Sequence, residues 1–249
     1  MIAAMCVALA TNASAYEVDF HYYVVYLLIR AHGYPPVEAD QLAGFSQYVD
    51  DNAKTEPLFC TSRTRAAFHF AGSDKRSATT ENLLEARDEL QQAFARYSLG
   101  SPPATYVVGA KLHLLADTFS HATFTAWWNR DVNCRAGSLR PCIGHADEEE
   151  DGHAPDRPYN APLKALRAAE ATYQLIPPPI SGGSTTIGWT SLQPELAAAF
   201  NDYGRVSIIE RTNRVRRIIE AHFNESPHYD KIRFRRKKSD YEAAVMAWK

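Results

Sequence analysis

Apolar residues recur at helical spacing along most of this 249-residue sequence, and almost no segment alternates like a strand. From Val18 to Arg30 they lie on nearly all sides of the predicted helix, which indicates a helix buried within the protein. Helices are predicted over residues 18–30, 35–49, 77–99, 103–124, 161–175, 192–203 and 206–223. The sequence therefore predicts an all-α fold of about seven helices with long loops.

Length and charge limit the functions to consider. A chain of 249 residues can bury a large core, and we expect residues 16–249 to form one helical metal-binding domain. Its 27 basic and 29 acidic residues give a formal charge of -2, which is too even for bulk attraction to nucleic acid or an anionic membrane. After the first residues, no segment reaches the ~18 apolar residues of a transmembrane helix. We infer no protein partner from the sequence.

The first 15 residues have some features of a secretory signal peptide. A short apolar run from Ile2 to Ala10 precedes Ala13-Ser14-Ala15, which is typical of a cleavage site, although no Lys or Arg precedes the run. Cleavage would leave Tyr16 as the first residue of a secreted or periplasmic protein. The alternative is an ordinary N-terminal segment of a cytoplasmic protein.

Cysteine usage is compatible with export. Cys134 and Cys142 bracket a short loop, and a disulfide between them would suit an oxidising compartment. Cys60 is then unpaired if Cys6 leaves with the signal peptide. Because the sequence has no Cys-x-x-Cys pair, we expect no zinc site built from cysteines.

The segment HLLADTFSH places two histidines and a carboxylate four residues apart on one predicted helix. Positions four apart drift by ~40° around an α-helix, so His113, Asp117 and His121 stay within a sector of ~80°. Imidazole nitrogen and carboxylate oxygen are ligands of zinc and similar divalent ions. This stripe therefore predicts a metal site on a rigid helix. The alternative is one hydrogen-bonded core histidine beside exposed polar groups.

Further histidines and carboxylates precede and follow this stripe. His21 lies at the start of the buried first helix, and His69 is flanked by aromatic residues in AAFHFAG; each is alternatively a hydrogen-bonded core histidine. Asp50 and Asp51 end the second predicted helix, as a cap or turn pair or as metal ligands. The segment GHADEEEDGHAPD is alternatively a solvated acidic loop, and it holds the last candidates: His145, Glu149, His153 and Asp156.

The motifs FHYY, SQYVDD, FHF, HLLADTFSH and GHA...PD, in this order on an all-α chain, resemble the superfamily of zinc-dependent phospholipases C and single-strand-specific zinc nucleases. The nearest resemblance is to an uncharacterised bacterial family that is similar to members of this superfamily. It spans residues 16 to 160, and the C-terminal helices carry no matching motif. The relatives have a longer gap between the helix Asp and the next His than DTFSH, and they begin with Trp where this chain has Tyr16.

This resemblance implies two or three zinc ions. One would be held by His69, His113, Asp117 and either Asp50 or Asp51. A second would be held by His121, His145 and Glu149, with Asp156 or His153 as substitutes. At a third, His21 would join Asp117. Characterised relatives also use the N-terminal amine and carbonyl of the mature chain at this third site, which cleavage before Tyr16 would supply.

The resemblance also implies hydrolysis of a phosphoric ester, because clustered divalent ions activate water, hold phosphoryl oxygens and stabilise the leaving oxygen. Asp50 or Asp51 would be a ligand and a candidate general base. The substrate stays open among a phospholipid, a nucleic acid and a smaller phosphoester. Several aromatic residues would line a lipid pocket, stack a base or belong to the core: Tyr22, Phe68, Phe70, Phe124, Trp127 and Trp128.

Two other functions are compatible with the sequence. The first is a non-catalytic helical protein with a structural metal site, although such a site needs only four ligands and the chain offers more. The second is binding to phosphates or to a membrane surface through the basic run KIRFRRKK, Lys231 to Lys238. That run is alternatively a solvated helix or tail.

Overall fold

The computed structural model describes residues 17–56, 61–74, 77–98, 102–123, 161–179, 186–201 and 207–248. Within these ranges every regular element is a helix, which confirms the all-α prediction. None of the described helices combines the length and the apolar character needed to cross a bilayer. The elements are η1 (Asp19–Val24, a π-helix), α1 (Val25–Ala31), α2 (Pro36–Asp51), α3 (Ser62–Phe68), α4 (Leu84–Ser98), α5 (Pro102–Ser120), α7 (Pro162–Leu175), α8 (Trp189–Phe200), α9 (Ile208–Phe223), α10 (Lys231–Arg235) and α11 (Lys238–Ala247).

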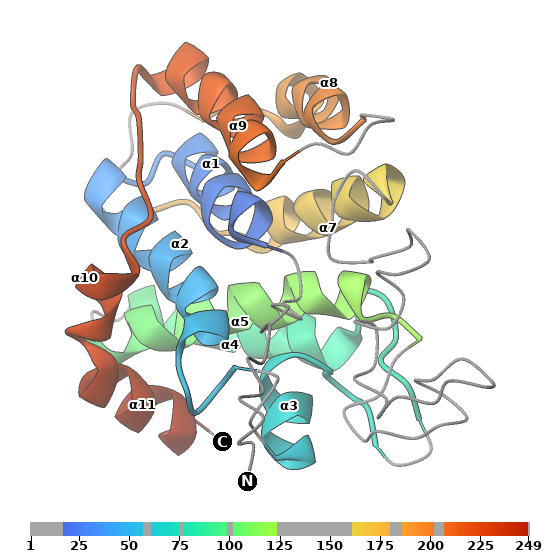
Figure 1. Cartoon of the computed structure of the whole chain (residues 1–249), viewed down its shortest axis with the longest axis vertical. Helices are drawn as coiled ribbons and strands as arrows, with labels where there is room; N and C mark the ends of the chain where they lie inside the picture. The colour runs from blue at the N-terminus through green and yellow to red at the C-terminus, as the bar shows by residue number, and fades with distance from the viewer. Residues whose placement is uncertain are drawn as a thin grey trace, which may run out of the picture.

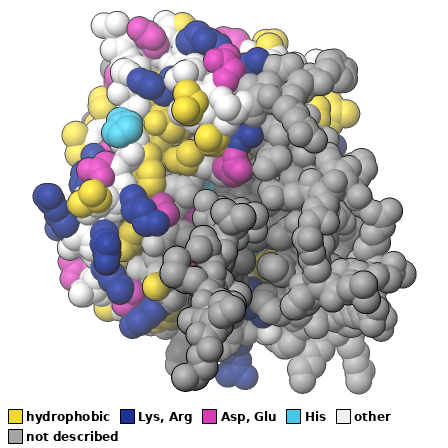
Figure 2. Space-filling model, viewed as in Figure 1, with side chains coloured by type: hydrophobic (Ala, Val, Ile, Leu, Met, Phe, Trp, Pro, Cys, Tyr) yellow, Lys and Arg dark blue, Asp and Glu magenta, His cyan; other side chains and the backbone are white. Residues whose placement is uncertain are grey.

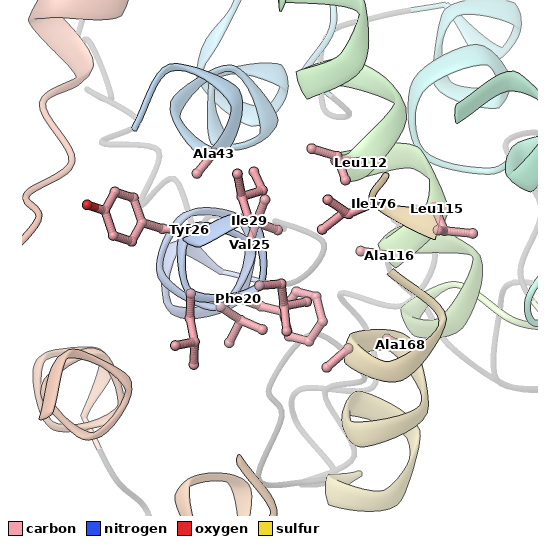
Figure 3. Close-up of a cluster of buried hydrophobic side chains, with 14 of the residues drawn as sticks. Phe20, Val25, Tyr26, Ile29, Ala43, Leu112, Leu115, Ala116, Ala168 and Ile176 are labelled. Carbon is pink, nitrogen blue, oxygen red and sulfur yellow. The ribbon is translucent and has the colours of Figure 1, made fainter. Parts of the chain in front are cut away.

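The continuous segment η1–α1 lies in the middle of the molecule, with α9 on one side and α2, α5 and α7 around the rest (Figure 1). Every residue from Asp19 to Ile29 is buried, as the apolar pattern predicts. Figure 3 shows side chains of this segment facing residues of α5, α7 and the segment after α7: Leu112, Leu115, Ala116, Ala168 and Ile176. The other helices therefore pack around a buried central helix.

A buried ion pair joins the start of η1 to α9. Arg211 Nε donates to Asp19 Oδ2 at 2.8 Å, and the same guanidinium contacts Glu17. Burial lowers the pKa of Arg211 to about 10, which leaves the side chain charged at neutral pH. Because a buried charge without its partner is strongly unfavourable, this pair fixes η1 relative to α9.

Helices α2 and α5 approach each other closely where α5 has a glycine. A Cβ at Gly109 would lie 2.5 Å from Phe45 Cβ and 3.0 Å from the Leu42 carbonyl oxygen. A glycine therefore lets the two backbones come within a distance that no other residue permits. Gly44 has the corresponding role on α2, where an added Cβ would overlap the ring of Phe234 from α10.

The basic run Lys231–Lys238 forms α10 and the start of α11 instead of a free tail. Phe234 is buried, Lys231 Nζ lies 2.6 Å from Asp51 Oδ1, and the Arg233 guanidinium lies 2.7 Å from Asp40. Basic side chains gather along the left edge of the face in Figure 2, over α10 and α11. Part of the positive charge of this run is thus paired with carboxylates of α2.

Several predicted boundaries are wrong. The helix predicted over 77–99 begins only at Leu84, because Asn82 has a left-handed φ of 55° and the Thr79 carbonyl accepts from Thr123 N–H at 2.9 Å. Helix α5 ends at Ser120, before the predicted end at 124, and α8 begins ahead of the predicted 192. No pattern predicts α3, α10 or α11. The first two have seven and five residues, too few to show a helical repeat.

The substitution Gly109→Ala tests the close crossing of α2 and α5. Helix propensity alone favours Ala by ~1 kcal/mol. We expect the overlap of the new Cβ with Phe45 to outweigh this, and to lower the free energy of unfolding in urea by ~1–3 kcal/mol. In the control Gly188→Ala the nearest atom to the Cβ is 3.7 Å away, so the change should stay below ~1 kcal/mol. A more stable Gly109→Ala protein would contradict the crossing.

Candidate metal centre

Asp117 lies among four histidines, and none of the five residues is exposed to solvent. On α5, His113 and His121 lie one turn before and one turn after Asp117, as the four-residue spacing predicts. Their Nε2 atoms are 3.0 and 3.4 Å from Asp117 Oδ2. The backbone N–H of His121 donates to the Asp117 carbonyl at 2.8 Å. The helical turn therefore continues beyond Ser120 and keeps His121 in the stripe.

His21 comes from η1. The N–H of Val25 donates to the carbonyl of Phe20, five residues earlier, as in a π-helix. In this conformation His21 Nε2 lies 3.2 Å from Asp117 Oδ1. The other three histidines instead face Asp117 Oδ2. The His21 and His113 rings are stacked, with centroids 3.9 Å apart. Short π-helical turns are rare and frequently occur at functional sites.

His69 follows α3 as its C-cap residue. Its Nδ1 lies 3.0 Å from Asp117 Oδ2 and 3.1 Å from His113 Nε2, and its Nε2 lies 2.7 Å from the Thr55 carbonyl oxygen. Because a carbonyl only accepts, Nε2 carries a proton, and the neutral tautomer compatible with this bond has its lone pair on Nδ1, which faces the cluster. Metal-binding histidines almost always have such a second hydrogen bond, which fixes the tautomer.

Of the two acidic residues that end α2, Asp50 faces the cluster. Its Oδ1 lies 3.7 Å from His113 Nε2 and 3.9 Å from His69 Nδ1, and its side chain is 6% exposed. The carboxylate of Asp51 instead accepts from the Tyr229 hydroxyl at 2.7 Å and pairs with Lys231 Nζ at 2.6 Å. The structure therefore brings Asp50 to the candidate centre and directs Asp51 toward the C-terminal segment.

The protonation of the cluster suits a cation. Burial lowers the pKa of His113 to about 3 in spite of the nearby Asp117, so this ring is neutral at neutral pH. Burial acts to raise the pKa of Asp117, but the adjacent His113 and His121 outweigh it and hold that pKa well below its ordinary value. An ionised carboxylate among imidazole rings is a donor set typical of zinc.

Two hydrogen-bond acceptors face each other within the cluster. Asp117 Oδ2 and the Nδ1 lone pair of His69 are 3.0 Å apart, and they repel each other unless a proton or a cation lies between them. A metal ion among Asp117, His69, His113 and Asp50 would remove this repulsion for all four acceptors at once. The residues present therefore fit a metal ion.

The distances among these acceptors also match a coordination shell. Ligands bound at ~2.0–2.1 Å in a tetrahedral zinc site lie ~3.3–3.4 Å from one another. The separations of Asp117 and Asp50 from the two rings of His69 and His113, and of these rings from each other, run from 3.0 to 3.9 Å. Three groups have ligand atoms within 4.8 Å of one another: His21, His113 and Asp117; Asp50, His69 and His113; and His69, Asp117 and His121.

The described ligands form three overlapping groups that share His69, His113 and Asp117. Only one nitrogen of His69 is available, because the other donates to Thr55, so His69 serves a single ion. Its Nδ1 lies within 3.9 Å of Asp50 Oδ1, Asp117 Oδ2 and His113 Nε2, so these three residues are its candidate co-ligands. His21 and His121 then lie on either side of Asp117 as first ligands of further ions. Each further site would need ligands beyond those that the described ranges bring together here.

Four candidate ligands lie outside the described residues, namely His145, Glu149, His153 and Asp156. The predicted disulfide between Cys134 and Cys142, the signal-peptide segment with Tyr16, and three aromatic candidates also lie outside them: Phe124, Trp127 and Trp128. Predictions on these residues stay predictions.

The described aromatic candidates differ in their surroundings. Phe70 stacks on the His121 ring, with centroids 4.2 Å apart, and is thus part of the candidate centre. Phe68 belongs to a buried hydrophobic cluster, and the hydroxyl of Tyr22 donates to Asp40 at 2.6 Å. Of these three described residues, Phe70 is the one whose ring stacks on a candidate ligand. The sequence offered no signal for Thr55, the partner of His69.

The N-terminal part of the chain, which carries three of the candidate ligands, matches a protein family. Residues 16–88 match the family described as "Family of unknown function (DUF6765)". This stretch includes His21, Asp50 and His69 and ends before α5. No curated protein and no solved structure matches the chain. The match gives no activity, so the resemblance to zinc phospholipases C and nucleases stays a prediction.

The variant Asp117→Asn tests whether the cluster binds metal. We expect zinc affinity, measured by competition with a chromophoric chelator, to fall by more than ~100-fold, because even a residue that only supports a ligand contributes ~10–100-fold. Asp51→Asn makes the same chemical change one residue after Asp50 but outside the cluster, and it should bind zinc like the unaltered protein. Equal zinc affinity for the two variants would rule out Asp117 as a ligand.

Proposed function

We propose that the protein is a metal-dependent hydrolase of phosphoric esters, and that zinc is its metal. The observation that supports this most is the set of donors around Asp117. A structural zinc needs four ligands in a closed shell. Here His21 and His121 add two further donors beside Asp50, His69, His113 and Asp117, which favours a cluster of ions over a single structural ion.

The proposed chemistry follows from such a cluster. Grouped divalent ions lower the pKa of bound water, clamp phosphoryl oxygens and stabilise charge on the leaving oxygen. Asp117 would bridge adjacent positions, since its Oδ1 faces His21 while its Oδ2 faces the other three histidines. The burial of these residues excludes bulk water and strengthens each electrostatic contact.

Asp50 is the best candidate for proton transfer among the described residues. Its side chain, 6% exposed, is the one member of the cluster that has measurable exposure, and it lies in the last turn of α2. A carboxylate placed between the cluster and solvent can accept a proton from an entering water molecule. Asp51 is engaged by Lys231 and Tyr229, so we assign it no catalytic role.

The substrate class follows from the resemblance in the sequence and remains open between phospholipids and single-stranded nucleic acid. Export through residues 1–15 belongs to the same proposal, because a new amino terminus at Tyr16 would stand close to His21 in sequence. Phe70 beside His121 supplies an aromatic face at the centre. Such a face suits either a nucleobase or an acyl chain.

The test compares hydrolysis before and after metal removal. Zinc-loaded protein should hydrolyse at least one of bis(p-nitrophenyl) phosphate, a short-chain phosphatidylcholine and a single-stranded oligonucleotide. Chelation should abolish this activity and added zinc should restore it. The variant His113→Ala/His121→Ala should lose more than ~100-fold, whereas the exposed His228→Ala should keep full activity.

The outcomes separate the candidate functions. Bound zinc with hydrolysis of any one substrate supports the proposal and identifies the substrate class. One zinc per chain with no hydrolysis of the three substrates would instead assign the cluster a structural role. No bound zinc, even after zinc is added, would exclude both.

A further inference from the structure

Thr55 connects the candidate ligands of two different helices. It lies in the turn after α2 and is fully buried. Its hydroxyl donates to the Val49 carbonyl at 2.8 Å, so the turn folds back onto the last turn of α2, which carries Asp50. Its own carbonyl accepts from His69 Nε2 at 2.7 Å. Thr55 thus contacts both the end of the helix that carries Asp50 and the ring of His69.

Tyr241 holds Thr55 from the far end of the chain. It comes from α11, is fully buried, and its hydroxyl lies 3.4 Å from Thr55 Oγ1. Since the Thr55 hydroxyl already donates to Val49, Tyr241 is the donor in this pair. Burial raises the pKa of Tyr241, so the phenol keeps its proton at neutral pH. The ring is held by Tyr48, with centroids 5.1 Å apart.

We propose that Thr55 is a positioning residue of the metal centre, and that Tyr241 supports it from α11. The inference rests on the proposed function only in that the cluster binds a metal. The Thr55 carbonyl selects the His69 tautomer that carries its proton on Nε2 and a lone pair on Nδ1. The two hydroxyl contacts keep that carbonyl in place.

This role predicts an effect that simple loss of stability would not produce. If the Thr55 carbonyl moves away, the His69 proton is free to sit on Nδ1, the atom that faces Asp117. A protonated Nδ1 cannot bind a metal, so metal affinity falls even when the protein stays folded. Supporting residues of this kind contribute ~10–100-fold to metal affinity.

The experiment measures zinc affinity and the visible spectrum of the Co²⁺-substituted full-length protein. Thr55→Val removes the hydroxyl with little change in shape, and we expect zinc to bind ~10–100-fold more weakly, with an altered Co²⁺ ligand-field spectrum. Thr55→Ser keeps the hydroxyl and should restore both. Tyr241→Phe should weaken zinc binding in the same direction. Thr172→Val, a matched change at another fully buried threonine, should leave both readouts unchanged.

Each result decides the inference. Weaker binding in Thr55→Val and Tyr241→Phe, rescue by Thr55→Ser and no effect of Thr172→Val would support it. Unchanged zinc affinity in folded Thr55→Val would overturn it and leave the metal centre intact. If Thr55→Val does not fold, unchanged affinity and spectrum in Tyr241→Phe would overturn it. If the unaltered protein binds no zinc, the proposed function fails together with the inference.

Discussion

The ionised carboxylate of Asp117, buried among helices, is the constraint on which the rest of the centre depends. A carboxylate removed from water is costly unless it is paired and hydrogen-bonded. Here four imidazole rings surround the carboxylate, each with a nitrogen 3.0 to 3.4 Å from an Asp117 oxygen, and a cation held among them would compensate its charge. These rings come from η1, the end of α3 and both neighbouring turns of α5, so the charge of one residue requires three segments to converge.

That convergence is built from apolar packing. Residues Asp19 to Ile29 of η1 and α1 are all buried, so packing against the core places His21 against α5. Gly109 allows α2 to approach α5 closely, which brings the end of α2 and Asp50 to the same region. The pair between Asp19 and Arg211 then fixes η1 from the opposite side. The candidate ligands are therefore positioned by the core that surrounds them.

Much of this arrangement is predictable from sequence, and the failures have physical reasons. Spacing predicts that His113, Asp117 and His121 share one face, because a helix has a fixed period. Spacing cannot choose between Asp50 and Asp51, which point in directions ~100° apart on α2, since the choice depends on where α10 lies. The contact between Thr55 and Tyr241 joins residues 186 positions apart, and no local pattern encodes such a pair. The π-helical turn at His21 likewise lies within an apolar run that reads as an ordinary helix.

The candidate ligands differ in how firmly the fold holds them. His21, His113 and Asp117 lie on helices whose apolar faces are buried in the core, so packing alone fixes their backbones. His69 instead follows a helix of seven residues, of which only Arg65 and Phe68 are buried. Its ring must be oriented by local contacts, chiefly the hydrogen bond to the Thr55 carbonyl. A ligand on a short helix needs such an external partner, and this explains why the C-terminal helix α11, which contributes no ligand among the described residues, reaches the centre through Tyr241.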